Sequence, residues 1–214
     1  DDLLNILNDE LREQSQTTQE QGMPDVFIDS LTVENFGPYY GRHEFKFTDL
    51  DGRSGILIGG KNGVGKTHLA VAVLRQVIAT RGARGIFYDT RDLLRVIRST
   101  YDPVNQVAEM DVLRPVMEAD MLVLDDLGAE KTSEWVEETL NLIVNSRYSA
   151  QRTTVFTSNY EDKPDTTDPD SLLFRIGYRM RSRLHEMCEF VDLDGADYRE
   201  LPPNGGVDDL ITLW

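Results

Sequence analysis

Residues 60–67 have the types and the spacing that phosphate chemistry requires. They read Gly-Lys-Asn-Gly-Val-Gly-Lys-Thr and satisfy the pattern G-x-x-x-x-G-K-[ST]. An apolar strand pattern precedes them and a helical pattern follows, and in that setting glycines let backbone N–H groups turn inward around a phosphate. We therefore predict a nucleotide-binding loop in which Lys66 reaches the β- and γ-phosphates and the Thr67 hydroxyl ligates Mg²⁺. The predicted nucleotide-binding residues here are Gly60, Lys61, Asn62, Gly63, Val64, Gly65, Lys66, Thr67 and His68.

Two carboxylates follow a second apolar strand pattern, Met121–Leu124. A hydrated Mg²⁺ beside a bound nucleotide needs such a carboxylate at the end of a buried strand. We predict that Asp125 ligates the metal together with Thr67, and that Asp126 faces the water that attacks the γ-phosphate. Without the loop at 60–67, a helix cap or a turn would be the simpler interpretation of this pair.

A third strand pattern, Thr153–Thr157, also ends in polar residues. Asn159 follows it and is predicted to orient the attacking water or to touch the γ-phosphate. An asparagine in this position without the other two features is typical of a turn.

Arginines recur at helical spacing in two places, and each group shares one face of a predicted helix. Like charges on one face repel one another and attract an anion. A neighbouring subunit's nucleotide phosphate, a nucleic-acid backbone and plain solvent all remain open as the partner. The two groups are Arg175, Arg179 and Arg183, and Arg91, Arg95 and Arg98.

The elements that must position these side chains alternate between strands and helices. The strand patterns lie at 56–58, 86–88, 121–124, 153–157 and 190–193, and the helical patterns at 66–80, 91–99, 105–118, 133–149 and 171–187. Such alternation predicts an α/β fold, a parallel sheet with helices on both faces. Before it, the patterns at 26–28, 31–33 and 43–47 indicate short N-terminal antiparallel strands.

Charge is distributed unevenly along the 214 residues. The formal net charge is −16, of which residues 1–50 contribute −8, residues 51–183 contribute −1 and residues 184–214 contribute −7. Strong acidity argues against a protein that holds nucleic acid by bulk charge, although a local basic strip leaves weak binding of single-stranded DNA open.

Composition excludes several classes of protein. No apolar run approaches the roughly 18–20 residues that cross a bilayer, and no secretory n-region and h-region open the chain. The single cysteine, Cys188, permits no intrachain disulfide, and the three histidines lack the spacing of zinc ligands. We expect a cytoplasmic protein with no membrane partner.

From about Gly63 to Arg199 the chain resembles the DnaC/IstB-like AAA+ ATPases, the bacterial replicative-helicase loaders and transposition helper ATPases. The resemblance covers roughly two thirds of the chain and rests on five stretches in the family's order. These are residues 65–70 (Gly-Lys-Thr-His-Leu-Ala), 122–128 (Leu-Val-Leu-Asp-Asp-Leu-Gly), 157–159 (Thr-Ser-Asn), 179–184 (Arg-Met-Arg-Ser-Arg-Leu) and 194–199 (Asp-Gly-Ala-Asp-Tyr-Arg).

The resemblance implies a P-loop NTPase fold of AAA+ type and assigns a role to each matching position. Lys66 and Thr67 would form Walker A, Asp125 and Asp126 Walker B, and Asn159 sensor 1. Arg183 would be the arginine finger that reaches a neighbouring subunit's ATP, and Arg199 the sensor-2-like arginine. A finger that acts on a neighbour implies a homo-oligomer.

The N-terminal part has a different likeness. Residues 26–66, including Leu31–Gly41 and Gly59–Gly63, resemble the opening of SMC-like or DndD-like ABC ATPases. The continuation of those proteins is absent, because the chain has neither a Leu-Ser-Gly-Gly signature nor a long heptad stretch. The longer C-terminal resemblance therefore decides the functional expectation.

We expect three regions: an acidic helix and linker appendage at 1–24, with a helical pattern at 2–13, a P-loop ATPase domain at 25–200, and a C-terminal tail at 201–214. The expected function is that of an ATP-binding, slowly hydrolysing helicase-loader type protein, a nucleotide switch in DNA replication. A replicative helicase or a similar DNA-processing protein is the expected partner. The alternatives are an IstB-like transposition helper ATPase, a non-hydrolysing nucleotide-gated adaptor, and an SMC/DndD-like ABC ATPase fragment.

Overall fold

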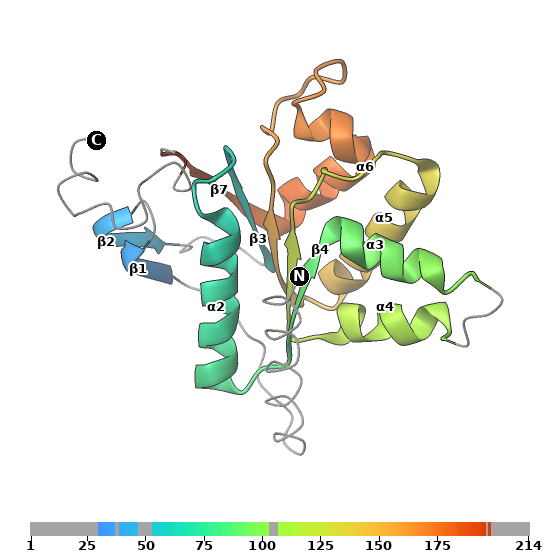
Figure 1. Ribbon diagram of the computed structural model, residues 1–214, viewed down its shortest axis with the longest axis horizontal. Helices are drawn as coiled ribbons and strands as arrows, with labels where there is room; N and C mark the ends of the chain where they lie inside the picture. Colours follow the sequence, from blue (N-terminus) through green and yellow to red (C-terminus); the bar gives the residue numbers. More distant parts are fainter. Residues whose placement is uncertain (1–29, 37–38, 47–52, 103–106, 196, 198–214) are drawn as a thin grey trace.

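The computed structural model of this chain describes residues 30–36, 39–46, 53–102, 107–195 and 197 (Figure 1). The predicted helix at 2–13, the predicted strand at 26–28 and the tail at 201–214 lie outside these residues. Within the described part, no helix combines the length and the apolar character that crossing a membrane requires.

A five-stranded parallel sheet forms the centre of the fold, in the order β4-β5-β6-β3-β7. The strands are β3 (Gly55–Gly60), β4 (Gly85–Asp89), β5 (Met121–Asp125), β6 (Thr153–Thr157) and β7 (Cys188–Leu193). Because all five run in parallel, their carboxyl ends meet at one edge, and the loops that leave this edge carry the predicted site residues. The predicted α/β fold is confirmed.

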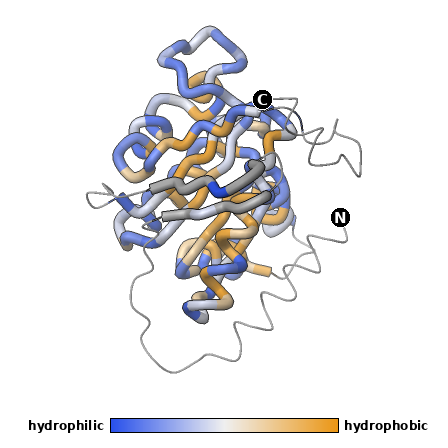
Figure 2. The backbone as a smooth tube through the Cα atoms, turned by 90° about the vertical axis from the view of Figure 1, so that its left-hand side faces the viewer, coloured by the Kyte–Doolittle hydropathy of each residue, from blue (hydrophilic) through white to orange (hydrophobic). Residues whose placement is uncertain are grey.

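Helices cover both faces of the sheet, as predicted, but unequally (Figure 1). The helix α2 (Lys66–Arg81) packs on one face, where Ile56 and Ile58 of β3 point. Leu57 points to the other face, since side chains alternate along a strand. That face carries α3 (Thr90–Ser99), α4 (Glu109–Glu118), α5 (Glu134–Ser149) and α6 (Leu172–Met187). Hydrophobic residues concentrate in the sheet and in α2 (Figure 2).

Two N-terminal strands, β1 (Ser30–Phe36) and β2 (Tyr39–Lys46), form a separate antiparallel pair. Their register runs from Ser30 opposite Lys46 to Phe36 opposite Tyr39. The expected antiparallel strands at 31–33 and 43–47 are therefore present, although β2 begins earlier and ends at Lys46.

Two helices differ from the prediction. The helix expected at 105–118 begins only at Glu109, because Ala108 is extended and its N–H donates to the carboxylate of Asp111. The helix expected at 171–187 is interrupted at Gly177, whose backbone has φ 77° and ψ 166°. This left-handed φ suits glycine, so α6 consists of a short first segment and a longer second one.

Cys188 opens β7, the edge strand of the sheet, and pairs with Gly55 of β3. Its side chain is 1 % exposed and packs against Gly55, where an added Cβ would lie 2.6 Å from the Cys188 sulfur. Burial strongly raises the pKa of this thiol. A glycine at position 55 is what allows the two strands to accommodate the sulfur.

Arg147 of α5 is fully buried at the amino-terminal edge of the sheet, opposite the predicted site. Burial lowers the pKa of its guanidinium to about 9, so the group is still charged at neutral pH. Its donors satisfy backbone carbonyls that the end of α4 leaves open, together with the first residues of β6. The acceptors are the carbonyl oxygens of Val116, Met117, Ala119 and Thr153, and Oγ1 of Thr154.

We expect Arg147→Ala to lower the free energy of unfolding by about 3–5 kcal/mol, because several buried carbonyls lose their donor and a cavity forms. Urea denaturation at neutral pH measures the change. The control is Arg114→Ala, which truncates an exposed arginine of α4 and should stay within about 0.5 kcal/mol of wild type. Equal small losses in the two variants would show that the buried guanidinium does not support the fold.

Candidate functional site

The loop between β3 and α2 presents backbone N–H groups to whatever binds above it. Gly65 caps α2 with φ 91° and ψ 14°, a left-handed conformation that favours glycine. No side chain caps this end of the helix and no acidic residue lies in its first turn. The N–H groups and the positive end of the helix dipole therefore remain available to an anion.

Lys66 follows Gly65 and folds back over the loop. Its side chain is 6 % exposed, and Nζ donates to the carbonyl oxygens of Gly60 at 2.7 Å and Lys61 at 2.6 Å. This ammonium group is thus held among the loop residues that the sequence assigned to phosphate. The Asp197 carboxylate lies against Gly63 of the same loop, whereas Arg199 lies outside the described residues.

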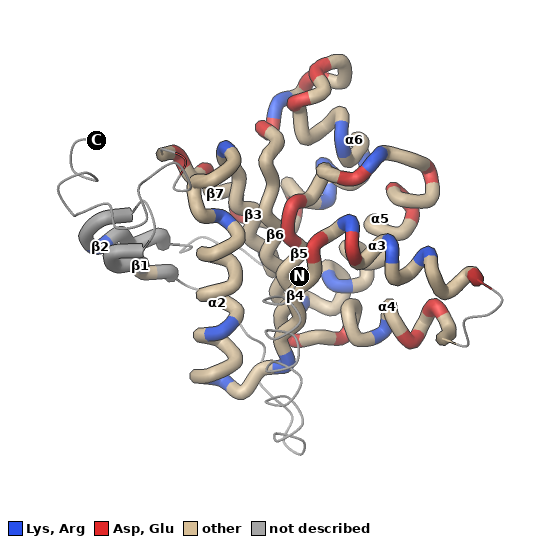
Figure 3. The backbone as a smooth tube through the Cα atoms, viewed as in Figure 1, with Lys and Arg blue, Asp and Glu red and all other residues tan. Residues whose placement is uncertain are grey.

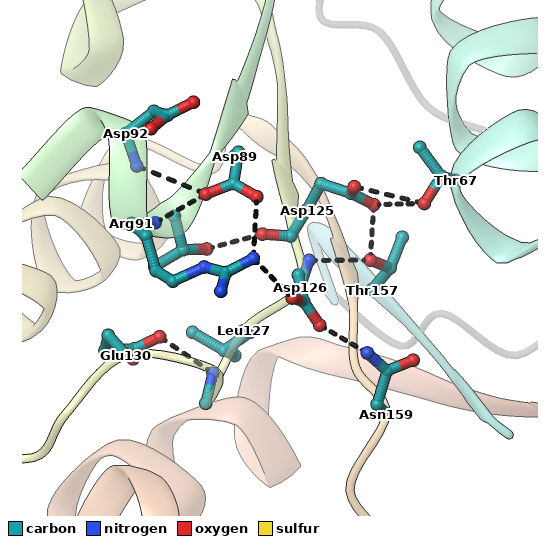
Figure 4. Close-up of polar contacts among 12 residues, drawn as sticks. Thr67, Asp89, Arg91, Asp92, Asp125, Asp126, Leu127, Glu130, Thr157 and Asn159 are labelled. Carbon is teal, nitrogen blue, oxygen red and sulfur yellow. Dashed lines mark hydrogen bonds and ion pairs between the residues drawn. The ribbon is translucent and has the colours of Figure 1, made fainter. Parts of the chain in front are cut away.

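Asp125 ends β5 and lies next to Thr67, as Figure 4 shows. Thr67 Oγ1 donates to both carboxylate oxygens, at 2.9 and 3.0 Å, and Thr157 Oγ1 donates to Oδ1 at 2.6 Å. Burial raises the pKa of Asp125, and the two hydroxyl donors offset part of that effect. The structure therefore brings together the two oxygen ligands that were predicted for the metal.

The Thr67 hydroxyl and the Asp125 carboxylate suit Mg²⁺, and they are too few to hold a metal whose ligands all come from the protein. Mg²⁺ takes one or two protein oxygens and completes its shell with water and phosphate. Thr67 and Asp125 offer a hydroxyl and a carboxylate, and the described residues contain no cluster of three or more His, Cys, Asp or Glu that would hold an ion alone. The open N-terminus of α2 beside them suits the phosphates of a nucleotide.

Asp126 is held on both of its carboxylate oxygens (Figure 4). Asn159 Nδ2 donates to Oδ1 at 2.5 Å, and Arg91 Nη2 donates to Oδ2 at 3.3 Å. Its backbone has φ 57°, and its N–H donates to Thr157 Oγ1. Burial is the largest influence on the carboxyl group and raises the pKa of Asp126. Asn159 therefore contacts the predicted water-orienting residue directly.

Three site residues escaped the sequence analysis. Thr157 bridges Asp125 and Asp126, Arg91 contacts Asp126, and Thr90 Oγ1 donates to the Asp125 carbonyl at 2.8 Å. All three lie at or just beyond the carboxyl ends of strands, so a search of those positions for polar residues would have found them. In the sequence, Arg91 is recognisable only as a member of the basic strip with Arg95 and Arg98.

Glu130 is a further buried carboxyl group near this edge. It is 6 % exposed, and Oε2 accepts from the Gly128 N–H at 3.1 Å. Burial raises the pKa of Glu130. Its contact fixes the turn that follows Asp126.

Arg183 contacts α5 and its own helix. Its guanidinium stacks on the Tyr148 ring with the carbon 4.3 Å from the centroid, Nε donates to Asn145 Oδ1, and Nη1 pairs with Glu186. It lines a groove between α5 and α6 together with Arg179. The predicted common face of the three arginines does not form as expected, because the Gly177 kink separates Arg175 from the others and Arg175 stacks on Tyr160.

The sequence leaves the partner of the arginine strip on α3 open among a phosphate, a nucleic acid and solvent, and the structure gives each arginine a contact within the chain. Arg91 pairs with Asp126 and Asp89, Arg95 pairs with Asp92, and Arg98 stacks on Trp135. The acidic partners lie within the same helix or at the site edge. Acidic side chains of the chain itself therefore neutralise Arg91 and Arg95, and an aromatic ring holds Arg98.

Comparison with known proteins gives a family match at residues 45–201, to the model described as IstB-like ATP binding protein. The replicative helicase loader DnaC of Buchnera aphidicola subsp. Baizongia pistaciae is 32 % identical over 106 residues, which are 50 % of this chain and 43 % of the relative. The replicative helicase loader DnaI of Bacillus subtilis (strain 168) is 29 % identical over 134 residues, 62 % of this chain and 40 % of the relative.

Among solved structures, a crystal structure of the DnaC helicase loader is 33 % identical, covers 75 % of this chain and 82 % of that chain, and has a TM-score of 0.57. The chain spans less than half the length of the curated relatives it matches. The family match begins at residue 45, and the likeness of residues 26–66 to the opening of SMC-like or DndD-like ABC ATPases stays a prediction.

We expect Asp125→Asn to have two opposite effects. Because the pKa of Asp125 is raised, folding disfavours its ionised form, and this cost disappears as the pH falls through the raised value. The variant should therefore raise Tm at neutral pH in the absence of metal and nucleotide. It should also reduce Mg²⁺-dependent binding of a fluorescent ATP analogue at least about tenfold. In wild type, that binding should weaken as the pH falls toward the raised pKa of Asp125, since a proton competes with the metal.

The matched control is Asp120→Asn, at the other end of β5. Although burial acts to raise it, the bonds from Arg84 lower the pKa of Asp120. Its replacement should lower Tm and leave the Mg²⁺ response unchanged. A fall in Tm for Asp125→Asn would contradict the cost assigned to burial of its carboxylate, and an unchanged Mg²⁺ response would contradict its role as a metal ligand.

Proposed function

Because the chain belongs to the family of IstB-like ATP-binding proteins, we propose that it binds Mg²⁺-ATP at the loop of residues 60–67 and hydrolyses it slowly. The observation that carries the proposal is the contact of Thr67 with Asp125 beside the folded-back Lys66. We further propose that the nucleotide state acts as a switch in DNA replication, in the manner of a helicase loader.

Each site residue has a proposed part in the hydrolysis. Thr67 and Asp125 would hold Mg²⁺, which neutralises phosphate charge together with Lys66. Asp126 would orient the attacking water, and Asn159 would contact the γ-phosphate. Arg199 would act as the sensor-2-like arginine. Asp126 has one methylene less than the glutamate of wider AAA+ proteins, and both of its oxygens are engaged by Arg91 and Asn159, which supports slow turnover.

Partners follow from the relatives and from the charge. The curated relatives are named replicative helicase loaders, so a replicative helicase is the proposed partner, bound by a homo-oligomer of this chain. Single-stranded DNA would be bound weakly, because acidic positions accompany the basic ones on α3 and α4 (Figure 3). The regions 1–24, 25–200 and 201–214 remain the proposed division of the chain.

A nucleotide-gated adaptor that binds ATP without turnover is the second candidate, favoured by the two side chains that occupy Asp126. Tight ATP binding without release of phosphate would identify it. The transposition helper remains an alternative within the same family, and filaments on duplex DNA would identify that function.

The arginine-finger assignment predicts that ATPase activity per subunit rises with protein concentration, because a neighbour must complete the site. Arg183→Ala should then reduce turnover by about 10³-fold while ATP binding is kept. Arg179→Ala, in the same groove, is the matched control and should cost far less. Turnover that is independent of concentration and unchanged in Arg183→Ala would exclude a finger acting on a neighbour.

The switch predicts that assembly depends on the nucleotide. Size-exclusion chromatography with ATP, with ADP and without nucleotide should give larger species with ATP, and a replicative helicase should co-elute in one state only. Single-stranded DNA is added in a parallel series and should bind more weakly as salt rises. Identical profiles in all three nucleotide conditions would rule out the switch.

A further inference from the structure

Asp162 joins the loop that follows β6 to the helix α6. Its Oδ1 accepts from Arg181 Nε at 2.6 Å and its Oδ2 accepts from Arg181 Nη2 at 3.2 Å, and His185 Nε2 lies 2.8 Å from Oδ2. The side chains of Asp162 and Arg181 are only 22 % and 19 % exposed. A two-point contact between carboxylate and guanidinium is directional, so it fixes the orientation of the helix relative to the loop.

The contact between Asp162 and Arg181 lies close in sequence to two proposed site residues, Asn159 and Arg183. Asn159, three residues before Asp162, donates to Asp126. Arg183 lies between Arg181 and His185 in sequence, and two helical positions correspond to about 200° of rotation. It therefore points away from Asp162, toward Asn145 and Tyr148 of α5.

Gly177 divides α6 into two segments, and Arg181, the partner of Asp162, lies in the second. The segment before it is tied to the loop, since Leu172 N donates to the Glu161 carbonyl and Arg175 Nε donates to the Pro169 carbonyl. The segment 178–187 follows the non-helical glycine and carries Arg181, Arg183 and His185. Asp162 thus spans the kink and links the loop to the second segment directly.

We propose that Asp162 is a positioning residue that couples Asn159 to Arg183 through the second segment of α6. The inference rests on the proposed function, in which Asn159 responds to the γ-phosphate and Arg183 acts on a neighbour. When Asn159 exchanges Asp126 for a phosphate, the loop shifts, and Asp162 carries this shift across Gly177 to residues 178–187. Arg183 then moves relative to α5. The nucleotide bound to one subunit thereby controls the position of the Arg183 side chain that acts on the neighbouring subunit.

Hydrogen–deuterium exchange of the whole chain tests the coupling without relying on turnover. In the absence of nucleotide, Asn159→Ala should raise exchange in residues 178–187 about three- to tenfold, and this effect should be absent when Asp162→Asn is already present. With a non-hydrolysable ATP analogue, wild type should change in both 159–165 and 178–187, whereas Asp162→Asn should change only in 159–165.

The matched control is Asp165→Asn, which removes the same charge from the same loop. Asp165 accepts hydrogen bonds from Thr167 and from the Asp168 N–H, both within the loop, so the Asp165→Asn variant should behave as wild type. In ATPase assays, Asp162→Asn should reduce kcat about tenfold with KM within about twofold, and should add no loss to Arg183→Ala.

Three results would overturn the coupling: Asn159→Ala leaves residues 178–187 unchanged, its effect persists unaltered in the Asp162→Asn background, or Asp162→Asn raises exchange throughout the protein as a general loss of stability would. Failure of the proposed function looks different. In that case residues 60–67 do not respond to the ATP analogue in wild type, while the nucleotide-free comparison of Asn159→Ala with the double variant still decides the coupling.

Discussion

The burial of the Asp125 carboxylate is the constraint on which the site depends. A charged group taken out of water is costly unless hydrogen bonds compensate it. Here two other elements supply part of that compensation, Thr67 at the start of α2 and Thr157 at the end of β6. The parallel register places Leu124 beside Phe156, one residue before Asp125 and Thr157. The pairing of β5 with β6 therefore places the Thr157 hydroxyl where it can stabilise the buried Asp125 carboxylate.

Thr157 also orders the neighbouring residues at the carboxyl edge of the sheet. Thr157 donates to Asp125 and accepts from the backbone of Asp126, so a single hydroxyl sets both acidic residues. Asp126 then adopts a left-handed backbone, and its side chain meets Asn159 and Arg91. The residues proposed for catalysis thus come from the four segments that follow β3, β4, β5 and β6. These segments are far apart in sequence and meet because they all leave the carboxyl ends of parallel strands.

Most of the fold was predictable because its signals are local. Apolar runs located all five parallel strands, and the loop at 60–67 with the carboxylates at 125 and 126 located the edge that carries the site. The contacts that were missed depend on residues far apart in sequence: Arg91 with Asp126, Thr157 with Asp125, and Asp162 with Arg181. The break at Gly177 escaped because a helical pattern continues on both sides of it, and only the backbone conformation reveals it.

The buried sulfur between β3 and β7 has a practical consequence. Alkylating reagents attack the thiolate, and the only cysteine of the chain is shielded from solvent with a pKa raised by burial. Maleimide or spin-label chemistry should therefore leave the folded chain untouched at Cys188. A cysteine introduced on the surface, for example in the second segment of α6, would then be the single reactive position, and a fluorophore there could follow that segment in real time without further changes to the protein.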